Sequence, residues 1–384
     1  MRYTATLDIF GQSYYNKLVM ESLCGIILKV QNETLGDTSQ TVLLGKTMGE
    51  WVALSLGEDA TVTMAEYDAG AEIPQTAKRY ADASKKYTAV LFSDTPLLTK
   101  KTVTDAVAVA ENGDLNVVKM TRGYIFRTSF LLSCEKLYTE NTHYFAEEDF
   151  LTASDPYNLS LVTDVMRNRI LRYHASRGVR FADLGTTVVE GDVVIAPGVE
   201  IGPQNILKGK TTVKEGARLL YANVIEDGII GEGAEINSSR IYRSYIGERT
   251  TVGPYAYIRP DSIIGPDCRI GDFVEIKKSI IGAKSKVSHL SYVGDCEMGE
   301  ACNIGCGVVF VNYDGKNKFK SKVGNRVFVG SNSNIIAPVV LEDGSFIAAG
   351  STLNQDVPQG ALAIARARQV NKPEWGGNKF CPKE

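Results

Sequence analysis

The chain has 384 residues, 44% of them hydrophobic, and its 42 basic and 45 acidic side chains give a formal charge of −3. A chain of this length usually folds as more than one domain, and the apolar fraction is sufficient for buried cores. The charges are well mixed and form no polybasic run, so we expect neither a nucleic-acid partner nor a membrane surface.

The first twenty residues interrupt their apolar positions with Asp8, Gln12 and Lys17, which excludes the core of a signal peptide. No apolar run of about 18 residues, the length of a membrane-spanning helix, appears later in the chain. We therefore expect a cytoplasmic protein.

The number and spacing of the cysteines indicate reduced thiols. The count is odd and no CxxC spacing occurs, unlike a disulfide framework: Cys24, Cys134, Cys268, Cys296, Cys302, Cys306 and Cys381. Three of them lie near His289 in the sequence, but their spacing is not that of a zinc site.

Residues 1–155 show the alternation of an α/β layer. The stretch from Glu72 to Lys86 is helix-like, and the apolar run from Tyr87 to Leu98 that follows it is typical of a strand. A small α/β domain is the prediction for this part of the chain.

A helix is predicted next, over residues 156–176. Asp155 supplies an N-cap and Pro156 a favourable first helical residue. Apolar residues then recur at helical spacing until Gly178: Leu159, Val162, Met166 and Ile170. We interpret residues 156–178 as a linker helix.

From residue 179 onward an aliphatic residue recurs every six positions. The series contains Ile195, Ile201, Leu207, Val213, Leu219, Ile230, Ile236, Ile246, Val252, Ile258, Ile264, Ile270 and Ile276, and a glycine often follows the aliphatic residue. Such a period predicts a repeat fold in which each hexad forms one flat face and three faces form a coil of about 18 residues. Residues 179–384 are thus predicted to form a parallel β-helix of hexapeptide repeats.

One segment breaks the six-residue count. Residues 312–322 read NYDGKNKFKSK and are polar and basic. We expect them to leave the prism as a loop, and loops on a rigid scaffold often carry function.

The segment from Tyr257 to Gln369 closely resembles the acetyltransferase domain of the bifunctional bacterial family of N-acetylglucosamine-1-phosphate uridylyltransferase and glucosamine-1-phosphate acetyltransferase. The matching stretches are YIRPDSIIG, GDFVEIKKSIIG, SKVSHLSYVGD, NIGCGVVFVNYDGKNKFK, VFVGSNSNIIAPV and AAGSTLNQDVPQGALAIARARQ. Long matches of this kind are more specific than a hexapeptide repeat alone. The resemblance implies a left-handed β-helix and acetyl-CoA as co-substrate, with no metal needed for acetyl transfer.

The resemblance also implies the catalytic residues. Acyl transfer to an ammonium needs a base that accepts protons near neutral pH, because a protonated amine has no lone pair for attack. His289, in KVSHLSYVG, stands where the family places its catalytic histidine. Glu275 matches a family carboxylate near that base and is expected to orient the imidazole.

The substrate and co-substrate residues are likewise carried over by position. A sugar phosphate needs cationic donors, and Arg259 and Lys277 match the family's, with Tyr292 and Asn303 on sugar hydroxyls or phosphate. Acetyl-CoA is expected along the side of the prism against Cys306, Asn312, Tyr313, Lys318, Ser331, Ala349 and Arg366. Cys306 stands where the family usually has alanine, which leaves open whether a backbone N–H or the thiol faces the site.

The first domain departs from the family's nucleotidyltransferase. Its start, MRYTATLDIFGQSYYNK, has no glycine-rich LAAGxGTRM-like loop for a triphosphate. The stretch SDTPLL resembles the family's GDxPL and places Asp94 at the metal-binding aspartate, with Asn158 near a second metal position. Asp94 would bind a metal only if this domain were active, and we interpret the domain as a shortened, degenerate relative.

The expected function is acetyl transfer from acetyl-CoA to glucosamine 1-phosphate, a step of UDP-N-acetylglucosamine and cell-wall biosynthesis, in a homotrimer. Two alternatives stay open within enzymes: residual nucleotidyl transfer, or another amino-sugar acceptor. A third belongs to another class, a non-catalytic regulatory protein that binds a sugar nucleotide. The simultaneous presence of His289, Glu275, Arg259 and Lys277 favours the enzyme.

Overall fold

The computed structural model describes residues 22–137, 141–373 and 375. The first residues, interpreted above as lacking a glycine-rich loop, therefore lie outside the described part of the chain. Cys381 does so as well. The chain divides into two compact units: residues 1–195 with 206–211 form unit 1, and residues 196–205 with 212–384 form unit 2.

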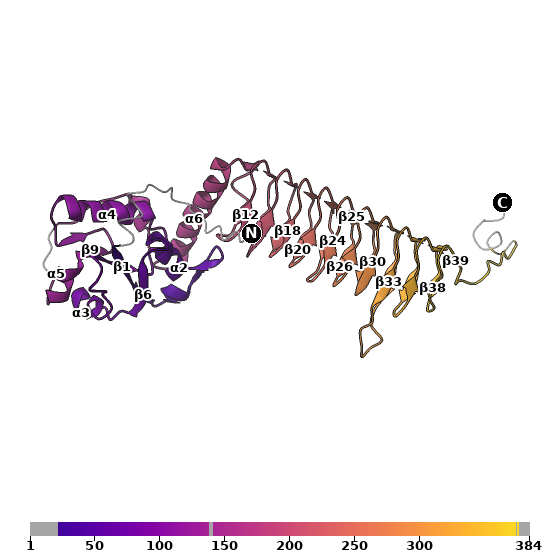
Figure 1. The fold of residues 1–384 in the computed structure, drawn as a ribbon, viewed down its shortest axis with the longest axis horizontal. Helices are drawn as coiled ribbons and strands as arrows, with labels where there is room; N and C mark the ends of the chain where they lie inside the picture. Colours follow the sequence, from indigo (N-terminus) through magenta and orange to yellow (C-terminus); the bar gives the residue numbers. More distant parts are fainter. Residues whose placement is uncertain (1–21, 138–140, 374, 376–384) are drawn as a thin grey trace, which may run out of the picture. The chain divides into compact units, whose positions relative to one another are not determined.

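Unit 1 contains a mixed sheet with helices on both faces (Figure 1). The strand order is β6-β1-β7-β9-β8, in which β6, β1 and β7 are parallel and β9 is antiparallel to both β7 and β8. The strands are β1 (Leu23–Lys29), β6 (Thr61–Glu66), β7 (Tyr87–Phe92), β8 (Val117–Lys119) and β9 (Tyr124–Arg127). The α/β class predicted for this part of the chain is confirmed.

Both faces of the sheet are buried, as the continuous apolar runs of β1 and β7 require. Leu23 and Ile27 of β1 pack with α2 (Met48–Ser55) and α4 (Lys100–Asn112). Alternate residues of the same strand point the other way and pack with α3 (Ile73–Ala77) and α5 (Thr128–Ser133). Short elements complete the unit: β2 (Gln31–Asn32), β3 (Gly36–Asp37), η1 (Thr38–Gln40), β4 (Val42–Leu43), β5 (Lys46–Thr47) and η2 (Glu147–Phe150).

The helix expected from Glu72 to Lys86 is much shorter in the structure, since α3 covers only Ile73–Ala77. The chain then turns at Asp82, whose carboxylate accepts hydrogen bonds from the backbone N–H and the hydroxyl of Ser84. Aspartate favours such a turn over helix continuation because its short side chain competes for local N–H groups.

Helix α6 spans Pro156–Ser176, the range that the sequence predicts. The carboxylate of Asp155 accepts the backbone N–H of Asn158 at 2.8 Å and so caps the first turn. Val162, Met166 and Ile170 are buried, as their spacing requires. The helix ends before Gly178, which has a φ of 94°.

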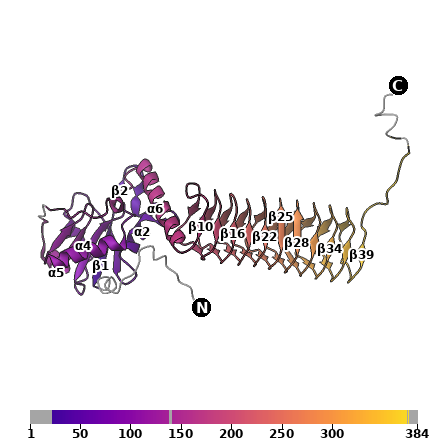
Figure 2. The same ribbon diagram turned by 90° about the horizontal axis from the view of Figure 1, so that it is seen from above.

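The chain then forms a solenoid of short parallel strands (Figure 2). Four of its first strands belong to unit 1: β10 (Arg180–Phe181), β11 (Val188–Val189), β12 (Val194–Ile195) and β14 (Ile206–Lys208). The remaining strands form three parallel faces of unit 2. Face 1 contains, in order, β13 (Glu200–Ile201), β16 (Arg218–Leu219), β19 (Glu235–Ile236), β22 (Thr251–Val252), β25 (Arg269–Asp272), β28 (Lys286–His289), β31 (Asn303–Ile304), β34 (Phe328–Val329), β37 (Phe346–Ile347) and β39 (Leu362–Ala363).

The other two faces have the same construction. Face 2 contains β17 (Val224–Glu226), β20 (Arg240–Tyr242), β23 (Tyr257–Ile258), β26 (Glu275–Lys277), β29 (Tyr292–Gly294), β32 (Val309–Val311), β35 (Asn334–Ile336) and β38 (Thr352–Leu353). Face 3 contains β15 (Thr212–Val213), β18 (Ile229–Ile230), β21 (Tyr245–Ile246), β24 (Ile263–Ile264), β27 (Ile280–Ile281), β30 (Cys296–Met298), β33 (Ser321–Val323) and β36 (Val340–Leu341).

The aliphatic residues of the six-residue period form the solenoid core. Every member of the series named above is buried, from Ile195 to Ile276. One residue per face points inward in each coil, so successive coils stack identical positions on one another. The predicted β-helix of hexapeptide repeats is confirmed. Residues 312–320 leave it as a loop between β32 and β33, close to the predicted range (Figure 1).

Candidate functional site

Four of the predicted site residues occupy the same position in four successive coils, at the corner between face 1 and face 2. They are His289, Cys306, Ser331 and Ala349. In each coil the next residue has a positive φ, and its N–H donates to the corner residue one coil earlier, as Gly350 does to Ser331 at 2.8 Å. A repeated corner conformation therefore aligns residues that are 17 to 25 positions apart in the sequence.

The predicted sugar-phosphate residues project from face 2. The register pairs Tyr257 with Glu275 and Glu275 with Tyr292, so these side chains form one column beside the corner. Lys277 lies two residues further along β26, toward the border with face 3. Arg259 follows β23, and its Nη1 donates to the Glu275 carboxylate at 2.8 Å.

Two lysine ammonium groups, of Lys277 and Lys318, lie near each other at the border between face 2 and face 3. The ammonium of Lys277 lies 3.7 Å from the carboxylate of Asp295, and its side chain is only 12% exposed. The neighbouring Lys318 ammonium, together with partial burial, holds the pKa of Lys277 below its usual range. Two ammonium groups repel each other, and an anion bound between them would stabilise both.

The imidazole of His289 pairs with a residue that the sequence reasoning missed. Its Nδ1 lies 2.5 Å from Oδ1 of Asp272, which occupies the same corner one coil earlier. Within the chain, Glu275 does not orient the imidazole as expected, because its carboxylate is held by Arg259. The distance of 17 residues between Asp272 and His289, one coil length, was the signal available in the sequence.

The predicted acetyl-CoA residues divide into two groups. Arg366 lies beside the corner column, since a Cβ built on Gly350 would be 3.8 Å from the Cδ of Arg366. Asn312 is buried at the other border of face 2 and donates to the Asp295 carboxylate. Tyr313 and Lys318 belong to the protruding loop and are bridged by their backbones.

Asn303 and Cys306 belong to the same coil, Asn303 on face 1 and Cys306 at the corner. Asn303 projects from face 1 in register with Lys286 of the preceding coil. Cys306 is half-buried, and its carbonyl accepts the N–H of Asn332 at 2.8 Å. Among the described residues, no hydrogen-bond acceptor is found for the peptide N–H of Cys306. Either the N–H or the thiol of Cys306 can therefore face a ligand.

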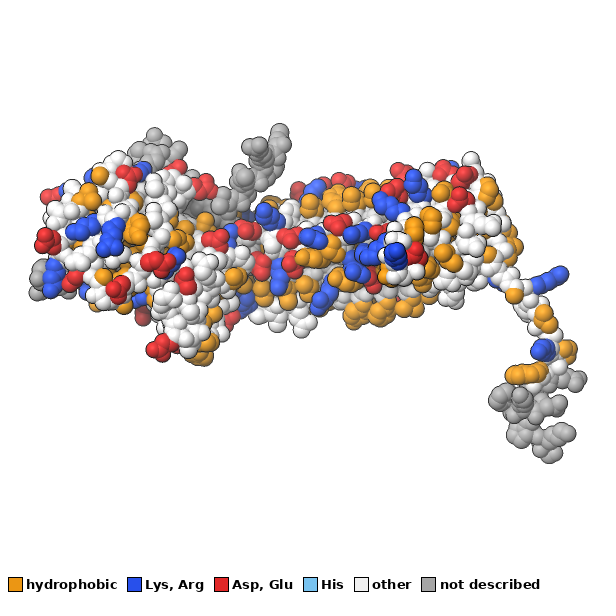
Figure 3. Space-filling view, turned by 90° about the horizontal axis from the view of Figure 1, so that it is seen from below, with side chains coloured by type: hydrophobic (Ala, Val, Ile, Leu, Met, Phe, Trp, Pro, Cys, Tyr) orange, Lys and Arg blue, Asp and Glu red, His pale blue; other side chains and the backbone are white. Residues whose placement is uncertain are grey.

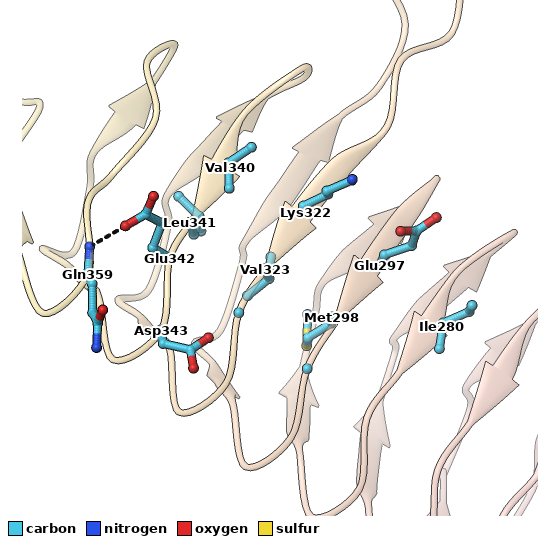
Figure 4. Close-up of a pocket in the computed structure, with 12 residues that line it drawn as sticks. Ile280, Glu297, Met298, Lys322, Val323, Val340, Leu341, Glu342, Asp343 and Gln359 are labelled. Atoms are coloured by element: carbon cyan, nitrogen blue, oxygen red, sulfur yellow. Dashed lines mark hydrogen bonds between the residues drawn. The ribbon is translucent and has the colours of Figure 1, made fainter.

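An open groove of about 620 Å³ lies elsewhere in unit 2, on face 3 (Figure 4). Apolar side chains such as Ile280, Val323 and Val340 line it together with polar ones, among them Glu297, Lys322 and Asp343. None of the sequence-predicted site residues lines it. Apart from Asn303 on face 1 and the loop residues Tyr313 and Lys318, the predicted residues of unit 2 lie on face 2 or at its borders, and none of them lines this groove.

In unit 1, Asp94 follows β7 and is nearly buried. Both carboxylate oxygens accept hydrogen bonds from Arg122, at 2.7 Å from Nε and 2.6 Å from Nη2. In the first turn of α6, the side-chain amide of Asn158 donates hydrogen bonds to the Ser154 hydroxyl and the Asp155 carboxylate. In the described part of the chain, no three His, Cys, Asp or Glu side chains form a metal-binding group. Asp94 and its surroundings therefore do not fit the metal that the resemblance implies.

Two family descriptions match the solenoid. Residues 241–314 match the family described as GMPPB C-terminal domain, and residues 320–355 match the bacterial transferase hexapeptide family of six repeats. Together they include the corner residues His289, Cys306, Ser331 and Ala349. Both matches fall within the solenoid, and the second is itself described by hexapeptide repeats.

Curated relatives match over the C-terminal part of the chain. The bifunctional protein GlmU of Clostridium acetobutylicum is 50% identical over 232 residues, which is 60% of this chain and 51% of the relative. GlmU of Clostridioides difficile is 50% identical over 228 residues, 59% of this chain and 50% of the relative. The chain spans about half the length of the curated relatives that it matches.

Among solved structures, an Arabidopsis UDP-N-acetylglucosamine acyltransferase aligns with 21% identity and a TM-score of 0.35, covering 52% of this chain and 77% of that one. Similarity at this level carries no functional argument. No helix in the described part of the chain has the length and hydrophobicity needed to cross a membrane.

Proposed function

The C-terminal part of this chain is homologous to bifunctional GlmU proteins, and from this premise we propose that the protein transfers an acetyl group from acetyl-CoA to the amine of glucosamine 1-phosphate. One observation carries the proposal. A histidine paired with a carboxylate lies at one border of face 2, and the cations Arg259, Lys277 and Lys318 gather across the same face.

The proposed reaction begins at His289. Its Nε2 accepts a proton from the acceptor ammonium, and the free amine attacks the thioester carbonyl carbon. The new N–C bond forms, the C–S bond breaks, and the leaving thiolate takes the proton back from the imidazolium. The nitrogen then releases its second proton to solvent, which leaves the neutral amide. A backbone N–H at the corner, such as that of Cys306, would stabilise the oxyanion of the tetrahedral intermediate.

The acceptor phosphate is proposed to bind between Arg259, Lys277 and Lys318. Arg259 and Lys277 are partly neutralised by Glu275 and Asp295, so the third cation leaves one excess positive charge for the anion. Tyr292 covers Gly294 on this face, where its hydroxyl can reach a sugar oxygen. Asn303, Asn312, Tyr313, Ser331, Ala349 and Arg366 are proposed to complete the sugar and acetyl-CoA contacts.

We further propose that unit 1 does not transfer nucleotides. The supporting observation is Arg122, which occupies both carboxylate oxygens of Asp94. A guanidinium in this position opposes divalent-metal binding by charge and by occupying the oxygen lone pairs. No pyrophosphate release is expected with UTP, N-acetylglucosamine 1-phosphate and magnesium; release well above a heat-killed control would contradict the proposal.

A homotrimer is proposed as the working form. Face 3 exposes a column of large aliphatic side chains, with Ile263 and Ile280 each 48% exposed. Hydrophobic side chains also form bands between charged rows on the solenoid surface in Figure 3. Symmetric association would bury such faces. Multi-angle light scattering that found only monomer at micromolar concentration would refute this assembly.

The decisive experiment measures thiol release from acetyl-CoA with a panel of amino sugars, their 1-phosphates and their nucleotides. The proposal expects turnover with glucosamine 1-phosphate well above that with the unphosphorylated sugar. If another amino-sugar phosphate were the preferred acceptor, acetyl transfer would be supported and the proposed acceptor would be wrong. Absence of turnover with every acceptor would favour a binding protein.

A further inference from the structure

The pairing between Asp272 and His289 is set by the backbone of the corner. Asp272 is the last residue of β25 and His289 the last of β28, and the register places them opposite each other. The N–H of Leu290 donates to the Asp272 carbonyl at 3.0 Å, which fixes the two corners in register. The side chains then meet with Oδ1 and Nδ1 2.5 Å apart.

Both corners place a bulky residue in the left-handed region. Phe273, after Asp272, has a φ of 54°, and Leu290, after His289, has a φ of 47°. Bulky side chains seldom adopt this conformation, which costs on the order of 1–3 kcal/mol. The same corner is formed by glycine after Cys306, at Gly307. The two apolar side chains are each 57% exposed.

We propose that Asp272 is the positioning residue of the base His289, a role that rests on the proposed acetyl transfer. An ionised carboxylate only accepts hydrogen bonds, so Nδ1 of the neutral imidazole must carry the hydrogen. Nε2 is then the free lone pair that takes the acceptor proton. The carboxylate also stabilises the imidazolium formed during the reaction.

The electrostatics of the surroundings agree with an ionised Asp272. The hydrogen bond with His289 lowers the pKa of Asp272, and Arg269 on the same strand adds to this effect by its charge. Lys286 lies on the same strand as His289 and in register with Arg269. The adjoining coil contributes Asn303, which is uncharged, and Cys306. Glu275 is held by Arg259 and supplies no second carboxylate to the ring.

The test uses Asp272→Asn, which preserves shape and removes the charge. The amide can donate to Nδ1 and so favours the tautomer with hydrogen on Nε2, which cannot act as a base. In the full-length protein we expect kcat to fall roughly 10- to 100-fold, with KM for both substrates unchanged within about two-fold. Asp272→Glu should recover part of the loss.

The matched control is Asp267→Asn, because Asp267 is a corner carboxylate on the same coil that pairs with Arg249 and not with His289. Its kcat should equal that of the wild type. An Asp272→Asn variant with wild-type kcat, or one that changes only KM, would overturn the positioning role.

Nitrogen-15 NMR of the imidazole rings provides a readout that needs no substrate, and the chain has only three histidines. At alkaline pH the wild-type His289 ring should carry its hydrogen on Nδ1, and the Asp272→Asn ring on Nε2. A wild-type ring with hydrogen on Nε2 would refute the positioning role alone. Absence of acetyl transfer in the wild type would refute the proposed function instead, so the two failures are distinguishable.

Discussion

The burial of His174 in α6 makes the stability of unit 1 depend on pH. Its side chain is 3% exposed, and the buried Nε2 has no hydrogen-bond partner among the described residues. Burial, with a smaller effect of the Arg177 charge, lowers the pKa of His174 from 6.5 to about 4. Protonation of the ring in the folded state is therefore strongly disfavoured.

The sign of the effect follows from proton binding. Above pH 6.5 the ring is neutral in both states and contributes nothing, whereas between pH 6.5 and 4 only the unfolded chain binds the proton. Stability therefore falls as the pH falls through this window. At 1.36 kcal/mol per pH unit the full loss is about 3 kcal/mol, of which about 2 kcal/mol is reached by pH 5.

The variant to test is His174→Leu, which removes the titrating imidazole and its unsatisfied nitrogen. Urea unfolding at pH 7.5 and pH 5 should be followed by the fluorescence of Trp51, which is buried in unit 1, in a Trp375→Phe background. Between the two pH values the variant should lose about 2 kcal/mol less stability than the parent.

The control variant is Tyr173→Leu, because the Tyr173 ring contacts the His174 ring edge-on and its removal leaves the imidazole in place. It should lower stability at both pH values and retain the pH dependence of the parent. An equal pH dependence in the His174→Leu variant and its parent would show that His174 does not cause the loss of stability.

The remaining predictions concern unit 2. His289→Ala should lower kcat by about 10²- to 10⁴-fold with little change in acceptor KM, and near-normal turnover at pH 7 would make the histidine structural. Arg259→Ala should mainly raise acceptor KM, through the loss of about 2–3 kcal/mol of binding free energy, because the substitution also leaves Glu275 unpaired beside the phosphate. An effect on acetyl-CoA KM would contradict this assignment. Gly294→Ala should raise acceptor KM on the order of 10-fold without unfolding, since the new Cβ would lie 2.4 Å from the Tyr292 hydroxyl; unchanged kinetics would show that Tyr292 does not touch the acceptor.

The solenoid can be predicted from the sequence alone. A single rule, one aliphatic residue every six positions, is repeated over many coils, and each repeat buries its aliphatic residue against the previous one. Ile258, Ile264 and Ile270 are buried for this reason alone. The cap at Asp155 and the spacing of Val162 and Met166 likewise determined α6, because helix signals act within a few residues.

Which charged groups meet could not be predicted without the folded structure. Glu275 and Asp272 lie three residues apart, yet one pairs with Arg259 on face 2 and the other with His289 at the corner. Strand pairing across coils sets these partners, and an exposed side chain carries no periodic signal of which neighbour it contacts. The same holds for Asp94, whose partner Arg122 is 28 residues away and is brought to it by the sheet. Local patterns specify burial, whereas ion pairs depend on register between distant segments, which only the folded chain provides.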